Sequence, residues 1–88
     1  MSWYSEGVHA LERRAVARIA SVRQARHMTQ KQLAEQVGIH QAAMSAIEAG
    51  KRYMRLGEAI AACTALGVDL GDVVSDEPLT LRTEVQFE

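Results

Sequence analysis

The chain has 88 residues, of which 24% are charged and 48% hydrophobic, and its formal net charge is −1 at pH 7. This length fits one domain with a modest core and excludes an elaborate enzyme with a large active-site cleft. No segment reaches the length of a membrane span, and the amino terminus lacks the basic-then-apolar order of a secretory signal. The single cysteine, Cys63, lies among apolar residues at helical spacing, which indicates a small core residue in a reducing compartment. These features predict a cytoplasmic protein.

The charge is divided unevenly along the chain. Residues 10–55 hold nine Lys or Arg against three Glu, whereas residues 56–88 hold one Arg against seven acidic residues. A polyanion would therefore meet a basic first half, while the acidic remainder would face away from it or bind elsewhere.

The first predicted helix covers about residues 5–27. Its apolar positions recur at intervals of three and four, with arginines mostly between them. These apolar positions are Val8, Leu11, Ala15, Ile19 and Val22. The pattern is typical of an amphipathic helix.

Two further helices are predicted on either side of a glycine turn. Thr29 can cap the first of them, and Gln32 can reach back to the Thr29 backbone amide. Gly38 ends that helix because glycine adopts positive φ readily, and a third helix runs from about residue 41 to 49 before Gly50. The residues expected to face inward are Leu33, Ala34, Val37, Ile39, Met44 and Ile47.

A fourth helix with a short fifth one completes the predicted helical part, which spans residues 6–74. The fourth ends at Gly67, and Asp69 can cap the fifth. The expected buried residues are Leu56, Ala59, Ile60, Cys63 and Leu66 in the fourth helix, and Leu70, Val73 and Val74 in the fifth.

Residues 79–88 alternate with a period of two, which predicts a strand in the extension formed by residues 77–88. A lone strand leaves its backbone groups unpaired, so we expect it to pair with the same strand of a second copy. The residues assigned to this dimerisation are Leu79, Leu81, Val85 and Phe87. The alternatives are a disordered extension or one that folds back on the fourth or fifth helix.

Residues 30–49 have the spacing of a helix-turn-helix. Ala34 permits two helices to cross closely, Gly38 accepts the backbone of the turn, and Ile39, Met44 and Ile47 fix the angle between the helices. Five constrained positions agree in one register.

The stretch MTQKQLAEQVGIHQAAMSAIEAGKR, residues 28–52, resembles the phage-repressor and Cro-like helix-turn-helix family, often called the XRE family. The resemblance runs from about Arg18 through ALGVDLGDVV. It leaves out the first dozen residues and the strand-like tail, and it implies a compact five-helix repressor-like domain. Together with the helical pattern of the chain, this predicts an all-α fold with a DNA-binding domain over residues 1–76 and a strand-like extension over residues 77–88. The resemblance also implies that the helix of residues 41–49 enters the major groove of DNA.

The composition of that helix suits contact with base edges. Gln41 can pair bidentately with adenine, Ser45 can reach a base or a phosphate, and small residues permit close approach and contact with thymine methyl groups. The predicted base-contacting residues are Gln41, Ala42, Ala43, Ser45 and Ala46. The predicted phosphate contacts are Gln30, His40, Lys51, Arg52, Arg26 and Arg55.

Three roles come from the resemblance. Gln30 is similar to the family's glutamine that binds phosphate and braces Gln41, and Arg23 and Glu48 are similar to its buried arginine and glutamate pair. The chain departs from the family at His40, where serine is favoured, and at Tyr53 and Met54, where Asn-Pro is frequent.

Catalytic and metal chemistry have little support in the sequence. The three histidines share no ligand spacing with Cys63 or with a carboxylate cluster. The carboxylates Glu6, Glu12, Glu35 and Glu58 have no accompanying nucleophile or phosphate loop, so we expect them on solvated helix faces. The sequence therefore predicts no catalytic residue, no metal site and no cofactor.

The predicted function is sequence-specific binding of duplex DNA by a homodimeric transcriptional regulator. Repression is the expected mode, on a pseudo-palindromic operator. One alternative is the antitoxin of a toxin pair that binds its own promoter. Another is a protein-interaction module that does not bind DNA, although such a module would need neither the two glutamines nor the basic residues that follow the third helix.

Overall fold

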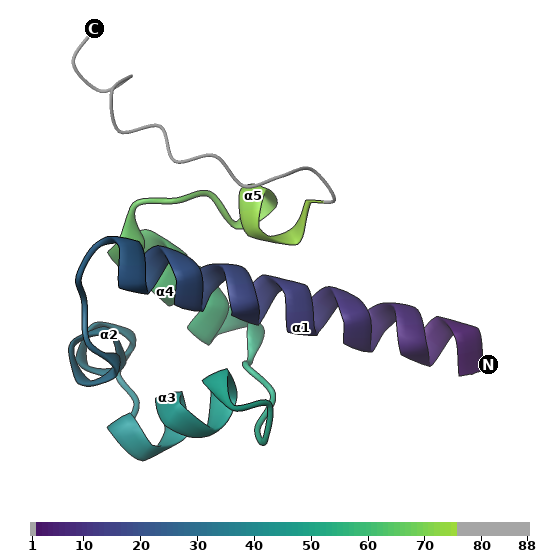
Figure 1. Ribbon diagram of the computed structural model, residues 1–88, viewed down its shortest axis with the longest axis horizontal. Helices are drawn as coiled ribbons and strands as arrows, with labels where there is room; N and C mark the ends of the chain where they lie inside the picture. Colours follow the sequence, from purple (N-terminus) through teal and green to yellow (C-terminus); the bar gives the residue numbers. More distant parts are fainter. Residues whose placement is uncertain (1, 76–88) are drawn as a thin grey trace, which may run out of the picture.

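The computed structural model describes residues 2–75, with side chains from residue 7 onward. Five helices form this part of the chain, as Figure 1 shows: α1 Ser2–Ala25, α2 Gln30–Val37, α3 Gln41–Glu48, α4 Leu56–Leu66 and α5 Leu70–Val74. No strand occurs between residues 2 and 75, so the predicted all-α class with five helices is confirmed for them. The predicted strand of residues 77–88 lies outside the described residues.

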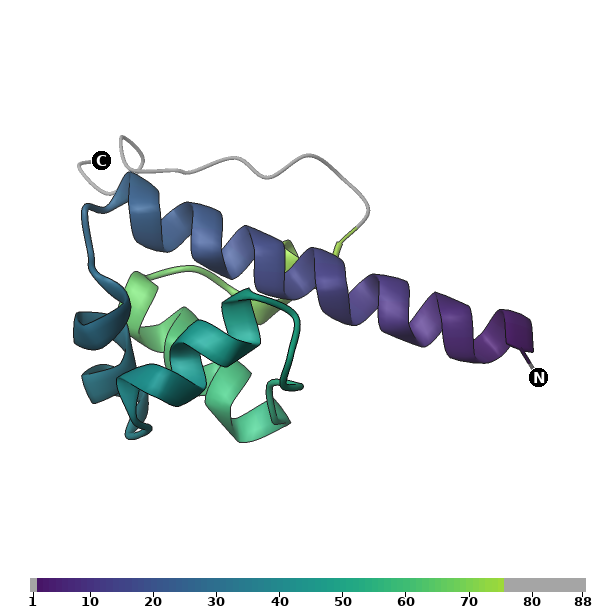
Figure 2. The ribbon, with the colours of Figure 1, turned by 60° about the horizontal axis from the view of Figure 1, so that its bottom comes forward.

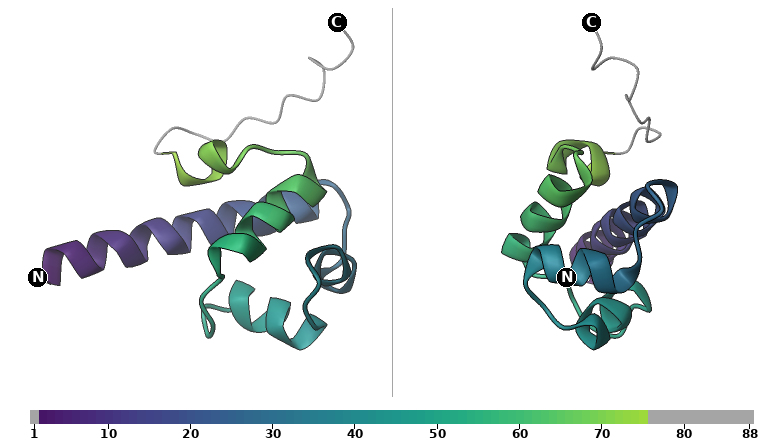
Figure 3. Two further views of the ribbon diagram at one scale, coloured as in Figure 1. Left: turned by 180° about the vertical axis from the view of Figure 1, so that it is seen from behind. Right: turned by 90° about the vertical axis from the view of Figure 1, so that its left-hand side faces the viewer.

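Helix α1 contacts three of the other four helices. It packs against α3, α4 and α5, while α2 packs against α3 and α4. Helices α3 and α5 lie on opposite sides of α1 (Figures 1 and 3). The amino-terminal half of α1 extends beyond the other helices, which is clearest in Figure 2.

A small core lies where the five helices meet. Most of the apolar residues predicted to be buried belong to it or pack against it. Burial raises the pKa of the Cys63 thiol, and the charge of Asp69 is a second cause. The buried apolar residues are Ile19, Val22, Leu33, Ala34, Met44, Ile47, Ala62, Cys63, Leu66 and Val73.

The prediction of a buried side chain is wrong for four residues. Val8 and Leu11 are exposed because they belong to the half of α1 that extends beyond the other helices. In α4, Leu56 is 69% exposed and Ile60 is 48% exposed. This helix has apolar residues on nearly every side, so its periodicity alone does not determine which side faces the core.

The helix ends follow local sequence signals. The Thr29 hydroxyl accepts the Gln32 amide at 3.0 Å, and the Gln32 side chain accepts the Thr29 amide at 2.8 Å, so the predicted capping box is confirmed. Asp69 is the N-cap residue of α5, as predicted, but its side chain makes no capping hydrogen bond.

The end of α1 differs from those of the next three helices. After α2, α3 and α4 the residue in the left-handed conformation is a glycine, namely Gly38, Gly50 and Gly67. After α1 it is His27, with φ 59°. There, the amides of His27 and Met28 donate to the carbonyls of Gln24 and Arg23 at 3.0 Å each. This is the hydrogen-bond pattern with which helices usually end at glycine.

Replacement of His27 by glycine is therefore expected to stabilise the fold. The left-handed conformation costs a residue with a side chain roughly 1–2 kcal/mol, and the greater freedom of glycine in the unfolded chain offsets part of that gain. We expect His27→Gly to raise the thermal midpoint by roughly 4 °C, measured by circular dichroism. His27→Ala is the control, and an equal midpoint for both variants would contradict this explanation.

Candidate nucleic-acid interface

Helices α2 and α3 are joined by a tight turn at residues 38–40. Gly38 has φ 90°, and the amides of Gly38 and Ile39 both donate to the Ala34 carbonyl, at 2.8 and 3.0 Å. Ala34 and Met44 are buried between the helices, and Ile39 packs against the core. The turn and these contacts fix the orientation of α3 relative to α2.

The outer side of α3 carries short or uncharged side chains. Gln41, Ala42 and Ser45 are exposed, whereas Ala43 and Ala46 are half-buried. Ala49, which sequence reasoning did not assign to this surface, is also exposed just after the helix. The remaining residues of this short helix, Met44, Ile47 and Glu48, are buried or, for Glu48, held in an ion pair. Only the outer side can therefore approach a ligand.

The start of α3 has a weak cap. His40 is exposed at the position before the helix, with φ −73° and ψ 152°, and its side chain makes no capping hydrogen bond. The amides of the first turn are therefore not covered by that side chain, and the positive end of the helix faces outward.

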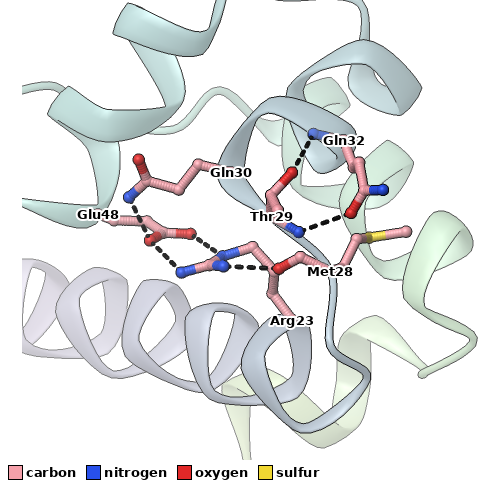
Figure 4. A network of polar contacts seen from close by, with 6 residues as sticks. All are labelled: Arg23, Met28, Thr29, Gln30, Gln32 and Glu48. Carbon is pink, nitrogen blue, oxygen red and sulfur yellow. Dashed lines mark hydrogen bonds and ion pairs between the residues drawn. The ribbon is translucent and has the colours of Figure 1, made fainter.

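A buried ion pair connects α1 to the end of α3, as Figure 4 shows. Arg23 Nε donates to Glu48 Oε2 at 2.8 Å, and Arg23 Nη2 donates to Glu48 Oε1 at 3.0 Å. Both side chains are only 10% exposed. Arg23 Nη1 also donates to the Met28 carbonyl at 2.7 Å, so the guanidinium holds the loop before α2 as well.

Gln30 joins the same network. Its Nε2 donates to Glu48 Oε1 at 2.8 Å, which ties the start of α2 to the end of α3. The resemblance implied that Gln30 braces Gln41, but the hydrogen bond formed here is to Glu48. Three helices are therefore connected through one carboxylate.

Basic residues follow α3 directly. Gly50 has φ 78°, the Lys51 amide donates to the Ala46 carbonyl at 2.8 Å, and the Lys51 side chain is exposed. The Arg55 side chain is 79% exposed, and its Nη1 lies 3.7 Å from Glu58 Oε2. Both cations are exposed in the segment between α3 and α4, and Arg55 forms an ion pair with Glu58 there.

Arg52 has a partner that the sequence did not reveal. Its two terminal nitrogens donate to the two carboxylate oxygens of Glu58, each at 2.9 Å. Glu58 also accepts the Arg55 backbone amide at 2.9 Å, at the start of α4. The expectation that Glu58 lies on a solvated helix face is wrong, since its side chain is only 12% exposed. These bonds lower the pKa of Glu58 to about 2, with the hydrogen bond from Arg52 as the largest cause.

Several arginines of α1 and of the segment just after it are bound to backbone carbonyls. Arg26 Nε donates to the Leu66 carbonyl at 2.6 Å, at the end of α4. Arg14 and Arg18 donate to the carbonyls of Val74 and Asp72, at 3.1 and 2.9 Å, in α5. A cation near the carboxyl end of a helix is favourable, so these residues position α4 and α5 against α1.

The fold and this surface define a helix-turn-helix protein. The sequence model of the Cro/C1-type helix-turn-helix DNA-binding domain matches residues 18–78, which is more than half of the chain. The chain therefore belongs to this family, the XRE family, and carries a DNA-binding domain rather than an enzyme. No curated protein and no solved structure matches the chain. None of the described helices is long and apolar enough to cross a membrane.

Loss of either partner of the Arg23–Glu48 pair alone is expected to destabilise the fold strongly. Arg23→Met or Glu48→Met alone leaves a buried charge unpaired, and each should lower the free energy of unfolding by about 3–5 kcal/mol. The double variant should lose much less than the sum. Urea unfolding of the three variants tests this, and additive losses would contradict a direct interaction.

Glu58 is expected to make the stability depend on pH. Its pKa in the folded protein is lowered from 4.5 to about 2. Its contribution is therefore complete above pH 4.5 and is lost as the pH falls toward 2. Urea midpoints measured across this interval should fall more steeply for the wild-type protein than for Glu58→Gln. Parallel pH profiles would show that the Glu58 charge contributes nothing.

Proposed function

We propose that this protein binds duplex DNA sequence-specifically, with α3 in the major groove, and regulates transcription. The observation that carries this proposal is the exposed side of α3. Between residues 36 and 57 the only acidic residue is Glu48, whose charge is paired with Arg23. The helix that would meet a polyanion and the segments on either side of it therefore carry no unpaired carboxylate.

Gln41 is the residue proposed to specify a base. It is exposed in the first turn of α3, and its amide can donate to and accept from an adenine edge. Ser45 lies one turn further on the same side and can reach a base or a phosphate. Ala42 offers a methyl group to thymine, and Ala43 and Ala46, which are half-buried, keep the flanks of the helix narrow.

Phosphate contacts are proposed at the ends of the helices. Lys51 and Arg55 are exposed cations of the segment between α3 and α4, where Arg55 is paired with Glu58, and His40 lies at the uncapped start of α3. Gln30 lies in the first turn of α2, where backbone amides favour an anion. Arg52 and Arg26 already hold Glu58 and Leu66, so a phosphate would share them with those partners.

A homodimer acting as a repressor is the proposed working form. Residues 1–76 would form the DNA-binding domain and residues 77–88 would pair with the same segment of a second copy. A twofold dimer predicts a pseudo-palindromic operator with half-site centres about 10 base pairs apart, or a multiple of that distance. Occupation of a promoter would then be sufficient for repression.

Two substitutions separate base contact from phosphate contact. Gln41→Ala should weaken specific binding by about 1–3 kcal/mol and relax one base position, with little effect on random DNA. Lys51→Ala should weaken binding to every sequence alike. It should also reduce the slope of the logarithm of the binding constant against the logarithm of the salt concentration by about one. Fluorescence anisotropy at several salt concentrations measures both effects.

Thr64→Ala is the control, since Thr64 is exposed on α4 outside the helix-turn-helix. It should leave the affinity and the salt dependence unchanged. An equal loss on specific and random DNA for Gln41→Ala would exclude the proposed base contact.

A further inference from the structure

An apolar groove lies beside the middle of α1, along residues 11–19. Its volume is about 480 Å³, and it is also bordered by the end of α3, the segment between α3 and α4, the start of α4, and α5. The apolar side chains that line it include Leu11, Val16, Tyr53, Met54, Leu56 and Val74. Ala49, just after α3, is among its lining residues, but Gln41, Ala42 and Ser45 are not.

Large side chains of this groove are open to solvent in the described part of the chain. Leu56 is 69% exposed, Tyr53 is 67% exposed and Leu11 is 39% exposed. Scattered exposed apolar residues are ordinary, but a contiguous set lining one groove is typical of a surface that binds another segment.

The chain itself supplies a segment next to the groove. Val74 lines the groove, the described residues end at Ser75, and thirteen residues follow. An extended chain of that length covers roughly 40 Å. The segment starts at the groove, so its local concentration there is high and little entropy is lost when it docks.

The sequence of that segment complements the groove. In an extended conformation Leu79, Leu81, Val85 and Phe87 share one face. The charged residues that line the groove are two acids and two bases, Glu12, Glu48, Arg13 and Arg52, so its complementarity to the segment is apolar rather than ionic. An apolar face of the segment therefore meets an apolar groove.

We propose that residues 77–88 dock in this groove of their own chain through the face that carries Leu79, Leu81, Val85 and Phe87. The two edges of the docked segment keep their backbone amides and carbonyls available. They can pair with the same segment of a second copy, and docking on helices supplies the apolar support that a two-stranded ribbon needs. The inference rests on the proposed function only for this dimer contact and is independent of DNA binding.

Nuclear Overhauser contacts in the full-length protein without DNA test the docking directly. Phe87 is the only phenylalanine, so its ring signals are unambiguous. We expect contacts from Phe87 and the leucines of the segment to the methyl groups of Leu56, Met54 and Val16. Ile60, which is exposed on α4 but does not line the groove, is the control and should show none.

Mixing isotope-labelled and unlabelled protein identifies the occupant. Contacts within one labelled chain support the proposal. Contacts that occur only between labelled and unlabelled chains would assign the groove to a second copy and overturn it, and so would the absence of any contact to the groove. Loss of DNA binding by the protein would not affect any of these outcomes, so the two proposals fail separately.

A pair of matched substitutions gives a second readout. In the described residues Ile60 is less exposed than Leu56, so Ile60→Gln should lower the thermal midpoint more than Leu56→Gln if the groove is empty. Docking reverses this order and gives Leu56→Gln the larger decrease, by roughly 4–8 °C. An unreversed order would overturn the proposal.

Discussion

The orientation of α3 depends on the ion pair between Arg23 and Glu48. Only two side chains of α3, Met44 and Ile47, are buried, and two apolar contacts on a helix of two turns leave its rotation weakly determined. Glu48 adds a third attachment at the end of the helix, where it accepts hydrogen bonds from Arg23 on α1 and Gln30 on α2. The side of α3 that faces outward is thus determined by a polar contact at one end and a glycine turn at the other.

The same arrangement explains the division of charge along the chain. Part of the basic first half is structural: Arg23 holds α3, and Arg14, Arg18 and Arg26 hold the backbone of α4 and α5. Lys51 and Arg55 are exposed in the segment between α3 and α4, where Arg55 also pairs with Glu58. The acidic second half supplies Glu58, which anchors Arg52 where the chain enters α4. Much of the charge that the sequence offers to a polyanion therefore serves the fold.

The sequence predicted those features that have a local signal. The capping box at Thr29 and Gln32, the turn at Gly38 and the inward positions of α2 and α3 each follow from residues a few positions apart. The exposure of the Leu56 and Ile60 side chains could not be predicted, because α4 has apolar residues on nearly every side. Nor could the contacts of Arg26 and Arg14, whose partners lie 40 and 60 residues away. Such pairs have no sequence spacing that would distinguish them from solvated arginines.

The central claim is that the exposed side of α3 distinguishes one DNA sequence from another. Selection of bound sequences from a random pool of duplex DNA, with the full-length protein at physiological salt, tests it most directly. The account predicts an enriched motif of twofold symmetry, with half-site centres about 10 base pairs apart or a multiple of that distance. No enrichment above the starting pool would contradict it.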